Sequence, residues 1–424
     1  MAGDDKPGEN NAPDEYFITK DYSAQPIRTA PGARKAPAIS KAPETRKKRR
    51  KKRRLLGVVF SLVSLAILSY VAIALISGQG FDFSRFTGLF GEKTPVPVVD
   101  ELNFDVGSNR VFADLGGFVA AAGTFGVQVF DFSGTETLRE PFRMSSPAID
   151  ASAGRAIAFD IGGTAACVFT GTRVEALFTG GGAIISASMN RNGWYCICSQ
   201  ESGAYLSIVS VYDNSGRNVY KVSLASGYAM KAALSSDNKR LAVLNLTDNG
   251  SEIALYELNL ESRTGVFELP GDLILDISFL PEGKLLAVSR ESLIIVDTGG
   301  TGTALYDFNG MRLGGYEFGD GFTALYLLDY GVGYSGRLVT LKETGEVLGE
   351  LATEKEIVSL SSGDGFLAIL RNEGLSFFDA NLEALSVDGN PAQAAGASRV
   401  AALGNSAALA AGDHFAVVVR IGAG

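Results

Sequence analysis

The chain is poor in the side chains that most catalytic and metal sites need. Its 424 residues include one histidine, three cysteines and one tryptophan. The histidine, His414, follows Gly412-Asp413, which predicts a tight turn. A serine–histidine–aspartate triad would have to use this residue, and a zinc site needs several His or Cys ligands. The glycine-rich stretches 180–182 and 299–302 lack the Lys-Ser/Thr of a phosphate-binding loop. The sequence therefore predicts no catalytic residue, no metal and no cofactor.

The cysteines Cys167, Cys196 and Cys198 do not form an evident disulfide plan. Cys196 and Cys198 are two apart in a predicted strand, so both point to one face, at a spacing that is wide for a disulfide. We expect all three to be buried small apolar side chains. A large domain without disulfides depends on its hydrophobic core for stability.

An uncharged apolar run, residues 55–77, is long enough to cross a bilayer as a helix. It follows nine consecutive basic residues: Arg46, Lys47, Lys48, Arg49, Arg50, Lys51, Lys52, Arg53 and Arg54. Basic flanks stay in the cytoplasm, so we expect residues 1–54 inside the cell and everything after residue 77 outside. A cleaved signal peptide is the competing interpretation, but its apolar segment is shorter and ends in a small-x-small site.

Charge is divided unevenly along the chain. Residues 1–54 contain 15 basic and 7 acidic side chains, whereas the remainder contains 23 basic and 40 acidic ones. The first segment is rich in Ala, Pro and Lys, which predicts a disordered tail whose basic end lies on anionic lipid headgroups. Nucleic acid is an unlikely partner, because no aromatic residues alternate with the basic ones. The apolar patch within residues 14–18 is a candidate docking motif.

Residues 78–95 predict a Gly- and Pro-containing linker, and residues 96–421 predict an all-β domain. Short apolar runs separated by Gly, Asp, Asn and Ser are typical of many strands joined by hairpins. The units recur about every 40 residues, the length of a four-stranded propeller blade. Their first strands begin near Arg110, Ala148, Ile184, Met230, Ile274, Gly315, Ile357 and Arg399.

These starts predict an eight-bladed propeller, with seven blades as the alternative because residues 314–351 are irregular. The last unit has room for three strands only. Residues 96–104 are expected to supply its fourth strand and so to close the ring. Third strands often end in two apolar residues and an aspartate, at Asp131, Asp213, Asp297 and Asp379, and we interpret these carboxylates as turn residues.

The Ser-x-Asp-x-Lys-x-Leu-Ala-Val turn at residues 235–243 and the apolar-apolar-Asp endings resemble bacterial propellers of the WD-repeat, YVTN-repeat and quinoprotein-dehydrogenase-like group. The whole arrangement resembles membrane-anchored propellers of unknown function, in which a basic tail and one helix precede the propeller. The quinone-dependent enzymes of that group carry repeated tryptophan motifs and a tryptophan floor under the cofactor. The single tryptophan here, Trp194, departs from that pattern and argues against such an enzyme.

We therefore expect a non-enzymatic binding or scaffolding module outside the cell membrane, with an envelope protein, a peptide or a glycan as its partner. Two alternatives remain: a propeller enzyme, either quinone-type or a carboxylate lyase or hydrolase, and a single-pass sensor that signals through its cytoplasmic tail. Propeller ligands usually bind at the channel mouth built by loops between blades. The candidate loop residues are Arg143, Tyr228, Asp272, Arg312 and Lys355.

Overall fold

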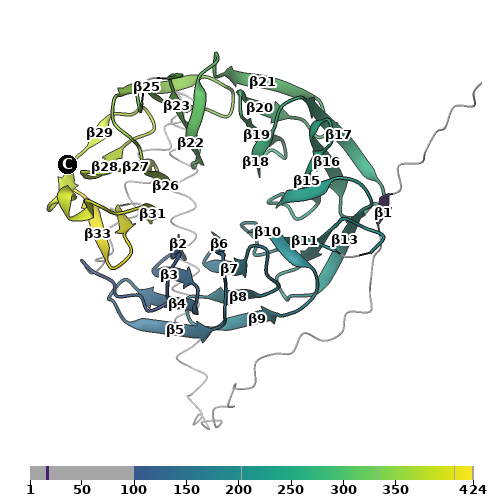
Figure 1. The fold of residues 1–424 in the computed structure, drawn as a ribbon, viewed down its shortest axis with the longest axis horizontal. Helices are drawn as coiled ribbons and strands as arrows, with labels where there is room; N and C mark the ends of the chain where they lie inside the picture. Colours follow the sequence, from purple (N-terminus) through teal and green to yellow (C-terminus); the bar gives the residue numbers. More distant parts are fainter. Residues whose placement is uncertain (1–15, 19–99, 202, 332, 405, 423–424) are drawn as a thin grey trace, which may run out of the picture. The chain divides into compact units, whose positions relative to one another are not determined.

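The computed structural model is a ring of eight antiparallel sheets around a central channel (Figure 1). It describes residues 16–18, 100–201, 203–331, 333–404 and 406–422. The eight-bladed propeller is confirmed, and the irregular sixth unit is an ordinary four-stranded blade. Each predicted start lies within three residues of the innermost strand of a blade.

Each blade has an innermost strand beside the channel and three further strands toward the rim. Blades 1 to 4 consist of β2 (Val111–Asp114), β3 (Phe118–Gly123), β4 (Gly126–Asp131) and β5 (Glu136–Pro141); β6 (Pro147–Ser152), β7 (Arg155–Asp160), β8 (Ala166–Thr170) and β9 (Val174–Phe178); β10 (Ala183–Met189), β11 (Tyr195–Gln200), β12 (Ser207–Tyr212) and β13 (Asn218–Leu224); β14 (Tyr228–Leu234), β15 (Arg240–Thr247), β16 (Gly250–Glu257) and β17 (Arg263–Pro270).

Blades 5 to 8 repeat the arrangement. They consist of β18 (Ile274–Phe279), β19 (Leu285–Ser289), β20 (Ser292–Val296) and β21 (Gly302–Asp307); β22 (Arg312–Phe318), β23 (Thr323–Leu328), β24 (Gly336–Leu341) and β25 (Val347–Thr353); β26 (Ser359–Gly363), β27 (Phe366–Arg371), β28 (Gly374–Phe378) and β29 (Ala384–Leu385); β30 (Val387–Asp388), β31 (Arg399–Leu403), β32 (Ala407–Ala411) and β33 (Ala416–Ile421), with a 3₁₀ turn, η2 (Pro391–Ala394), before β31.

The core lies between neighbouring blades rather than inside any one of them. The second strand of a blade is buried on both faces, as in β23, where all six residues are buried. Strands of this kind read as continuous apolar runs, because two blades pack on them. The outermost strands are more exposed, and in β5 every residue is exposed or half-buried. The three cysteines are free and buried, as expected from the sequence.

The aspartates that end the third strands act as turn residues. Oδ1 of Asp131 accepts the Ser133 and Thr135 amides, both at 2.9 Å. Oδ1 of Asp297 accepts the Gly299 and Thr301 amides at 2.9 and 2.8 Å. The Ser133 hydroxyl, together with these amides, lowers the pKa of the Asp131 carboxyl below its ordinary value, and the Thr301 and Gly299 amides lower that of Asp297. Equivalent bonds form at Asp213 and Asp379.

The ring closes where the two ends of the propeller meet on β33. The Val418 amide donates to the Asp100 carbonyl, and the Leu102 amide donates to the Ala416 carbonyl. The predicted closing segment is therefore confirmed at residues 100–102. It is not the whole fourth strand, because the short β30 pairs with the end of β33 beyond it. An ion pair of 2.7 Å between Arg420 and Asp100 joins the two segments. The described ring thus contains its own core and its own closure.

One further strand, β1 (Tyr16–Ile18), pairs antiparallel with β13 on the outer edge of blade 3. The predicted linker, the apolar run and its basic flank lie outside the described residues. Within the part of the chain that the structure describes, no helix is long and apolar enough to span a membrane.

Candidate functional site

The propeller has two chemically different faces. The loop face carries the connections from the outermost strand of one blade to the innermost strand of the next, together with the turns between second and third strands. The turn face carries the other hairpin turns. The channel runs between these faces, and each end has to be considered separately.

At the turn face, a cavity of about 470 Å³ lies in the channel of blades 2 to 6. Lys231 of β14 forms an ion pair with Asp276 of β18 in its wall. The Tyr316 hydroxyl donates to the same carboxylate at 3.2 Å. Across the cavity, Arg191 of blade 3 pairs with Asp320 of blade 6 at 3.1 Å. The charged groups of this cavity therefore join blades to one another.

Two further carboxylates of the wall accept amides from the next blade. Oδ2 of Asp150 accepts the Met189 amide at 2.7 Å, and Oε1 of Glu317 accepts the Ser362 amide at 3.1 Å. The innermost strands of adjacent blades belong to different sheets, so these side chains satisfy backbone groups that no strand pairing reaches. Each carboxylate therefore joins one blade to the next, and we call Asp150 and Glu317, together with the Lys231–Asp276 ion pair, the latches.

Burial changes the acidity of the latch residues. It raises the pKa of Asp150 and of Glu317, although the amides that they accept oppose the shift. Burial lowers the pKa of Lys231, but the neighbouring Asp276 carboxylate outweighs this effect and the net pKa is raised. Shifts of this kind are typical of functional sites and of structural ion pairs alike. Every one of these groups has a structural partner, which favours the structural interpretation.

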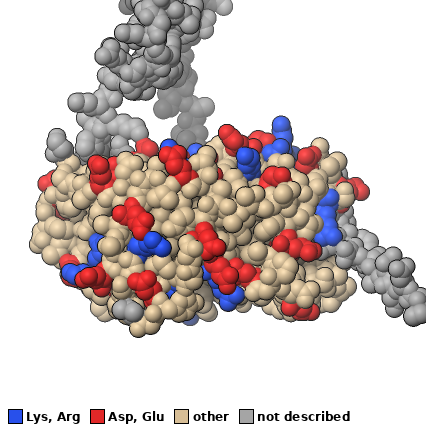
Figure 2. Space-filling model, turned by 90° about the horizontal axis from the view of Figure 1, so that it is seen from above, with Lys and Arg blue, Asp and Glu red and all other residues tan. Residues whose placement is uncertain are grey.

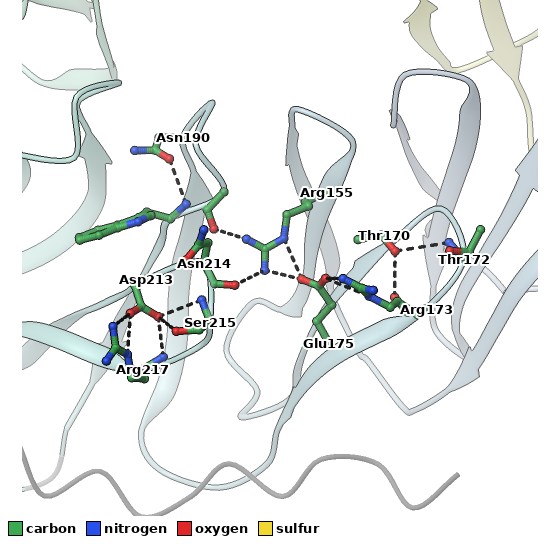
Figure 3. A network of polar contacts seen from close by, with 12 residues as sticks. Arg155, Thr170, Thr172, Arg173, Glu175, Asn190, Asp213, Asn214, Ser215 and Arg217 are labelled. Atoms are coloured by element: carbon green, nitrogen blue, oxygen red, sulfur yellow. Dashed lines mark hydrogen bonds and ion pairs between the residues drawn. The ribbon is translucent and has the colours of Figure 1, made fainter. Parts of the chain in front are cut away.

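A second polar brace joins blades 2 and 3 on the turn face (Figure 3). Arg155 lies between the Glu175 carboxylate of its own blade and the carbonyl groups of Gly193 and Asn214 in blade 3. Arg173 pairs with the other oxygen of Glu175 at 2.8 Å. The brace is fully occupied by these partners and contributes to blade packing.

The loop face instead exposes large apolar side chains. Within the described residues, the most exposed ones lie on this face, apart from Leu260 and Val347 on the turn face. They are concentrated on blades 3 to 5, where six of them form a group that we call the apolar rim: Leu206, Tyr228, Met230, Leu246, Leu273 and Leu275.

A repeated β-bulge exposes the members of the apolar rim nearest the channel. The pairing of β14 with β15 skips Met230, and that of β18 with β19 skips Leu275. A bulge leaves one residue unpaired and changes the direction of its side chain. Met230 and Leu275 are accordingly 43% and 44% exposed, although the residue before each of them, Ala229 or Ile274, is buried.

An equivalent hydrogen bond, from a strand amide to a serine hydroxyl of the preceding blade, lies beside the apolar rim in blades 4 and 5. The Ala229 amide donates to Oγ of Ser207 at 3.0 Å, which brings β14 beside the start of β12. The Ile274 amide donates to Oγ of Ser251 at 2.9 Å, which brings β18 beside the start of β16. Tyr228 is also the direct cross-strand partner of Leu246. Hydrogen bonds therefore link the strands that carry the apolar rim from blade 3 to blade 4 and from blade 4 to blade 5.

The five candidate residues from the sequence all lie on the loop face, but the structure does not gather them into one site. Tyr228 belongs to the apolar rim, and Asp272 is buried beside it, paired with Arg290 at 3.0 Å. Arg143 and Arg312 are exposed on blades 2 and 6. Lys355 pairs with Glu373 on blade 7 at 2.6 Å. None of the five lines the turn-face cavity.

The polar latches and the bulged rim residues were missed from the sequence. A signal for the second group is present in two aligned repeats. Tyr228-Ala229-Met230 precedes Lys231, and Leu273-Ile274-Leu275 precedes Asp276. Each is a run of three apolar residues followed by a charged residue of the channel wall. Such a run departs from the alternation of a regular strand and indicates that one of the three is not paired regularly.

A family model matches residues 92–308, which include the whole apolar rim. The chain belongs to the family of unknown function DUF5711. A search of curated proteins found no relative. Family membership therefore groups this propeller with similar sequences and leaves its activity to be inferred from the site.

Solved structures show a shared fold at low sequence identity. BamB from Moraxella catarrhalis is 13% identical, with a TM-score of 0.50, over 76% of this chain and 99% of that one. The C-terminal WD40 domain of Sif2 is also 13% identical, with a TM-score of 0.50, over 77% of this chain and 98% of that domain. The resemblance to WD-repeat propellers is thus confirmed for the fold, and at this identity it indicates the fold alone.

Proposed function

We propose that this family member is a non-enzymatic binding or scaffolding module, held at the outer face of the cell membrane by a helix over residues 55–77. Its partner docks on the loop face of the propeller. The observation that carries the proposal is the apolar rim, a group of exposed apolar side chains on the loop-face ends of blades 3 to 5. Apolar patches of this kind commonly mark interaction sites.

The intramolecular bonds of the two faces support the choice of the loop face. The charged groups of the turn-face cavity bond to neighbouring blades, and within the described residues no group of three or more His, Cys, Asp or Glu side chains could hold a metal ion. The rim side chains, in contrast, retain much of their surface exposed to solvent. Complete burial of a fully exposed side chain of this kind contributes about 1.5–3 kcal/mol, and a partner gains the share that corresponds to the surface still exposed.

Site-directed photo-crosslinking in intact membranes tests the docking face. A crosslinking amino acid replaces Met230 or Leu275 in the full chain, and the control positions are Leu260 and Val347, which are similarly exposed on the turn face. We expect defined crosslinked products from the first pair and none from the second. Equal products from both pairs, or none from the loop face, would contradict the proposal.

The predicted topology has a separate test. A tail inside the cell and a propeller outside it cannot pair in one chain, so the topology and the β1–β13 pairing exclude one another. The native cysteines are buried, which leaves introduced ones as the reactive thiols. On intact cells, we expect a membrane-impermeant maleimide to label the Glu282→Cys variant and not the Ser23→Cys variant. Labelling of both would place the tail outside and overturn the topology.

A further inference from the structure

Exposed carboxylates share the loop-face ends of blades 3 to 5 with the apolar rim. Four exposed acidic side chains lie at the loop-face ends of blades 3 to 5, and we call them the acidic border: Glu201, Asp248, Glu268 and Glu291. The loops that carry the rim and the border span 201–206, 225–230, 246–250, 268–275 and 289–292. Among their described residues Arg290 is the one basic side chain, and it pairs with Asp272.

This sector is therefore more one-sided in charge than the ring as a whole. Figure 2 shows basic and acidic side chains interspersed along the side of the ring, with acidic ones more frequent. Elsewhere on the loop face, Arg143, Arg312 and Lys355 lie on blades 2, 6 and 7. The apolar rim and an excess of negative charge thus coincide on the same three blades.

Resting on the proposed function, we propose that the docking partner is a protein segment that combines apolar side chains with lysine or arginine. Apolar side chains of the segment pack on Met230 and Leu275, and its cations face the acidic border. A partner without cations would desolvate these carboxylates and leave them unpaired, which is unfavourable. Opposite charge also accelerates encounter and suppresses wrong partners. An acidic segment or an anionic lipid surface would be repelled.

A pair of model peptides provides the probe. One is a short amphipathic peptide of leucine and lysine, and the other has glutamate in place of every lysine. Binding to residues 96–424, which include the complete closed ring, is measured by fluorescence anisotropy, with thermal melting to show that each variant is folded. We expect the lysine peptide to bind about tenfold or more tightly than the glutamate peptide, with an affinity that falls as salt is added.

Three variants locate the binding surface. Met230→Ser with Leu275→Ser should weaken binding of the lysine peptide about tenfold or more, because the apolar contact is lost. Asp248→Asn with Glu291→Gln should weaken it less and flatten its salt dependence. Leu260→Ser with Val347→Ser, matched in exposure on the turn face, should leave binding unchanged.

The outcomes separate this inference from the proposed function. If the rim substitutions lower the affinity for both peptides equally, docking on the loop face is supported and the inference of a cationic partner is wrong. If the rim variant binds like the wild type, both fall. Self-association in gel filtration that the rim variant abolishes would identify a second copy as the occupant and overturn the inference. Rim-dependent sedimentation with phosphatidylcholine vesicles would overturn it in favour of a lipid surface.

Discussion

The two ends of the propeller channel differ in how their side chains are satisfied. At the turn face, the partly exposed charges of Lys231 and Asp276 pair across blades, and the carboxylates of Asp150 and Glu317 each accept a backbone amide from the next blade. At the loop face, bulges turn Met230 and Leu275 outward, where much of their surface is in contact with water. A group that has its partners inside the fold contributes to the fold, whereas an exposed apolar group is available for a partner. The comparison therefore assigns an architectural role to the turn face and supports the proposal that a partner docks on the loop face.

The largest contrast is expected between two leucines of blade 5. Leu285 is 1% exposed and Leu275 is 44% exposed. Leu285→Ala should lower the free energy of unfolding by about 2–5 kcal/mol, because it leaves a cavity between blades. Leu275→Ala should change it by less than about 0.5 kcal/mol. Urea unfolding of both variants measures the difference, and similar losses would mean that the rim belongs to the core.

The next effect concerns the ion pair of the channel wall. Lys231→Met removes the ammonium group and leaves the Asp276 carboxylate with the Tyr316 hydroxyl and the Ile277 amide as its partners. Because both side chains are partly exposed, at 33% and 15%, we expect a loss of about 2 kcal/mol, below the value for a fully buried pair. Adding Asp276→Asn to Lys231→Met removes the unpaired charge, so the double variant should regain most of the lost stability in the same unfolding experiment. A single variant as stable as the wild type would show that the pair is not a latch.

A smaller effect should appear in the pH dependence of stability. Burial raises the pKa of Glu317 in the folded state above its value in the unfolded chain. The folded state therefore favours the protonated carboxyl, and this stability is present below the unfolded pKa and lost as pH rises through the folded pKa. Glu317→Gln cannot ionise and can still accept the Ser362 amide. Its melting temperature should match the wild type near about pH 4 and exceed it at neutral pH.

The exposed Glu282→Gln variant is the control for this measurement and should follow the wild type at both pH values. Asp150, whose pKa is also raised by burial, should retain part of the pH dependence until it too is replaced by asparagine. A Glu317→Gln variant that is destabilised at neutral pH would contradict the assignment, since it would mean that the ionised carboxylate stabilises the latch.

The smallest effect is expected for the bridge across the turn-face cavity. Arg191 and Asp320 are 70% and 64% exposed, so solvent screens their attraction. Arg191→Ala should change the free energy of unfolding by less than about 0.5 kcal/mol. This change in the free energy of unfolding can be compared directly with the change caused by Lys231→Met. A loss as large as that of Lys231→Met would mean that the bridge holds blades 3 and 6 together.

Much of the fold could be predicted because it is local and repeated. The turn at Asp297 needs only residues within four positions of the aspartate, and the same turn recurs in other blades. The spacing of these turns gave the unit length and the number of blades. The closing segment followed from counting strands in the last unit. The prediction that residues 96–104 form the whole fourth strand was incomplete, because β30 supplies the rest of it and carries too few residues for a pattern.

The candidate site was predictable in part. The five candidate residues lie on the loop face, as their positions between blades predicted, and Tyr228 and Asp272 lie in or beside the apolar rim. The bulges were not predicted, because a strand start such as Leu273-Ile274-Leu275 has the same composition as a buried one. Which of these residues points outward depends on the register with the neighbouring strand, and one unpaired residue changes it.

The sequence by itself determined the repeat, the turns, the all-β class and the closure of the ring, since these follow from patterns within each unit of about 40 residues. Only the tertiary structure decided how the blades contact one another. The latches join residues of different units, and their geometry depends on how adjacent sheets pack. The bulges similarly decide which apolar side chains face solvent. Strand patterns specify a blade, but the surface that a partner meets is produced when eight blades pack around one channel.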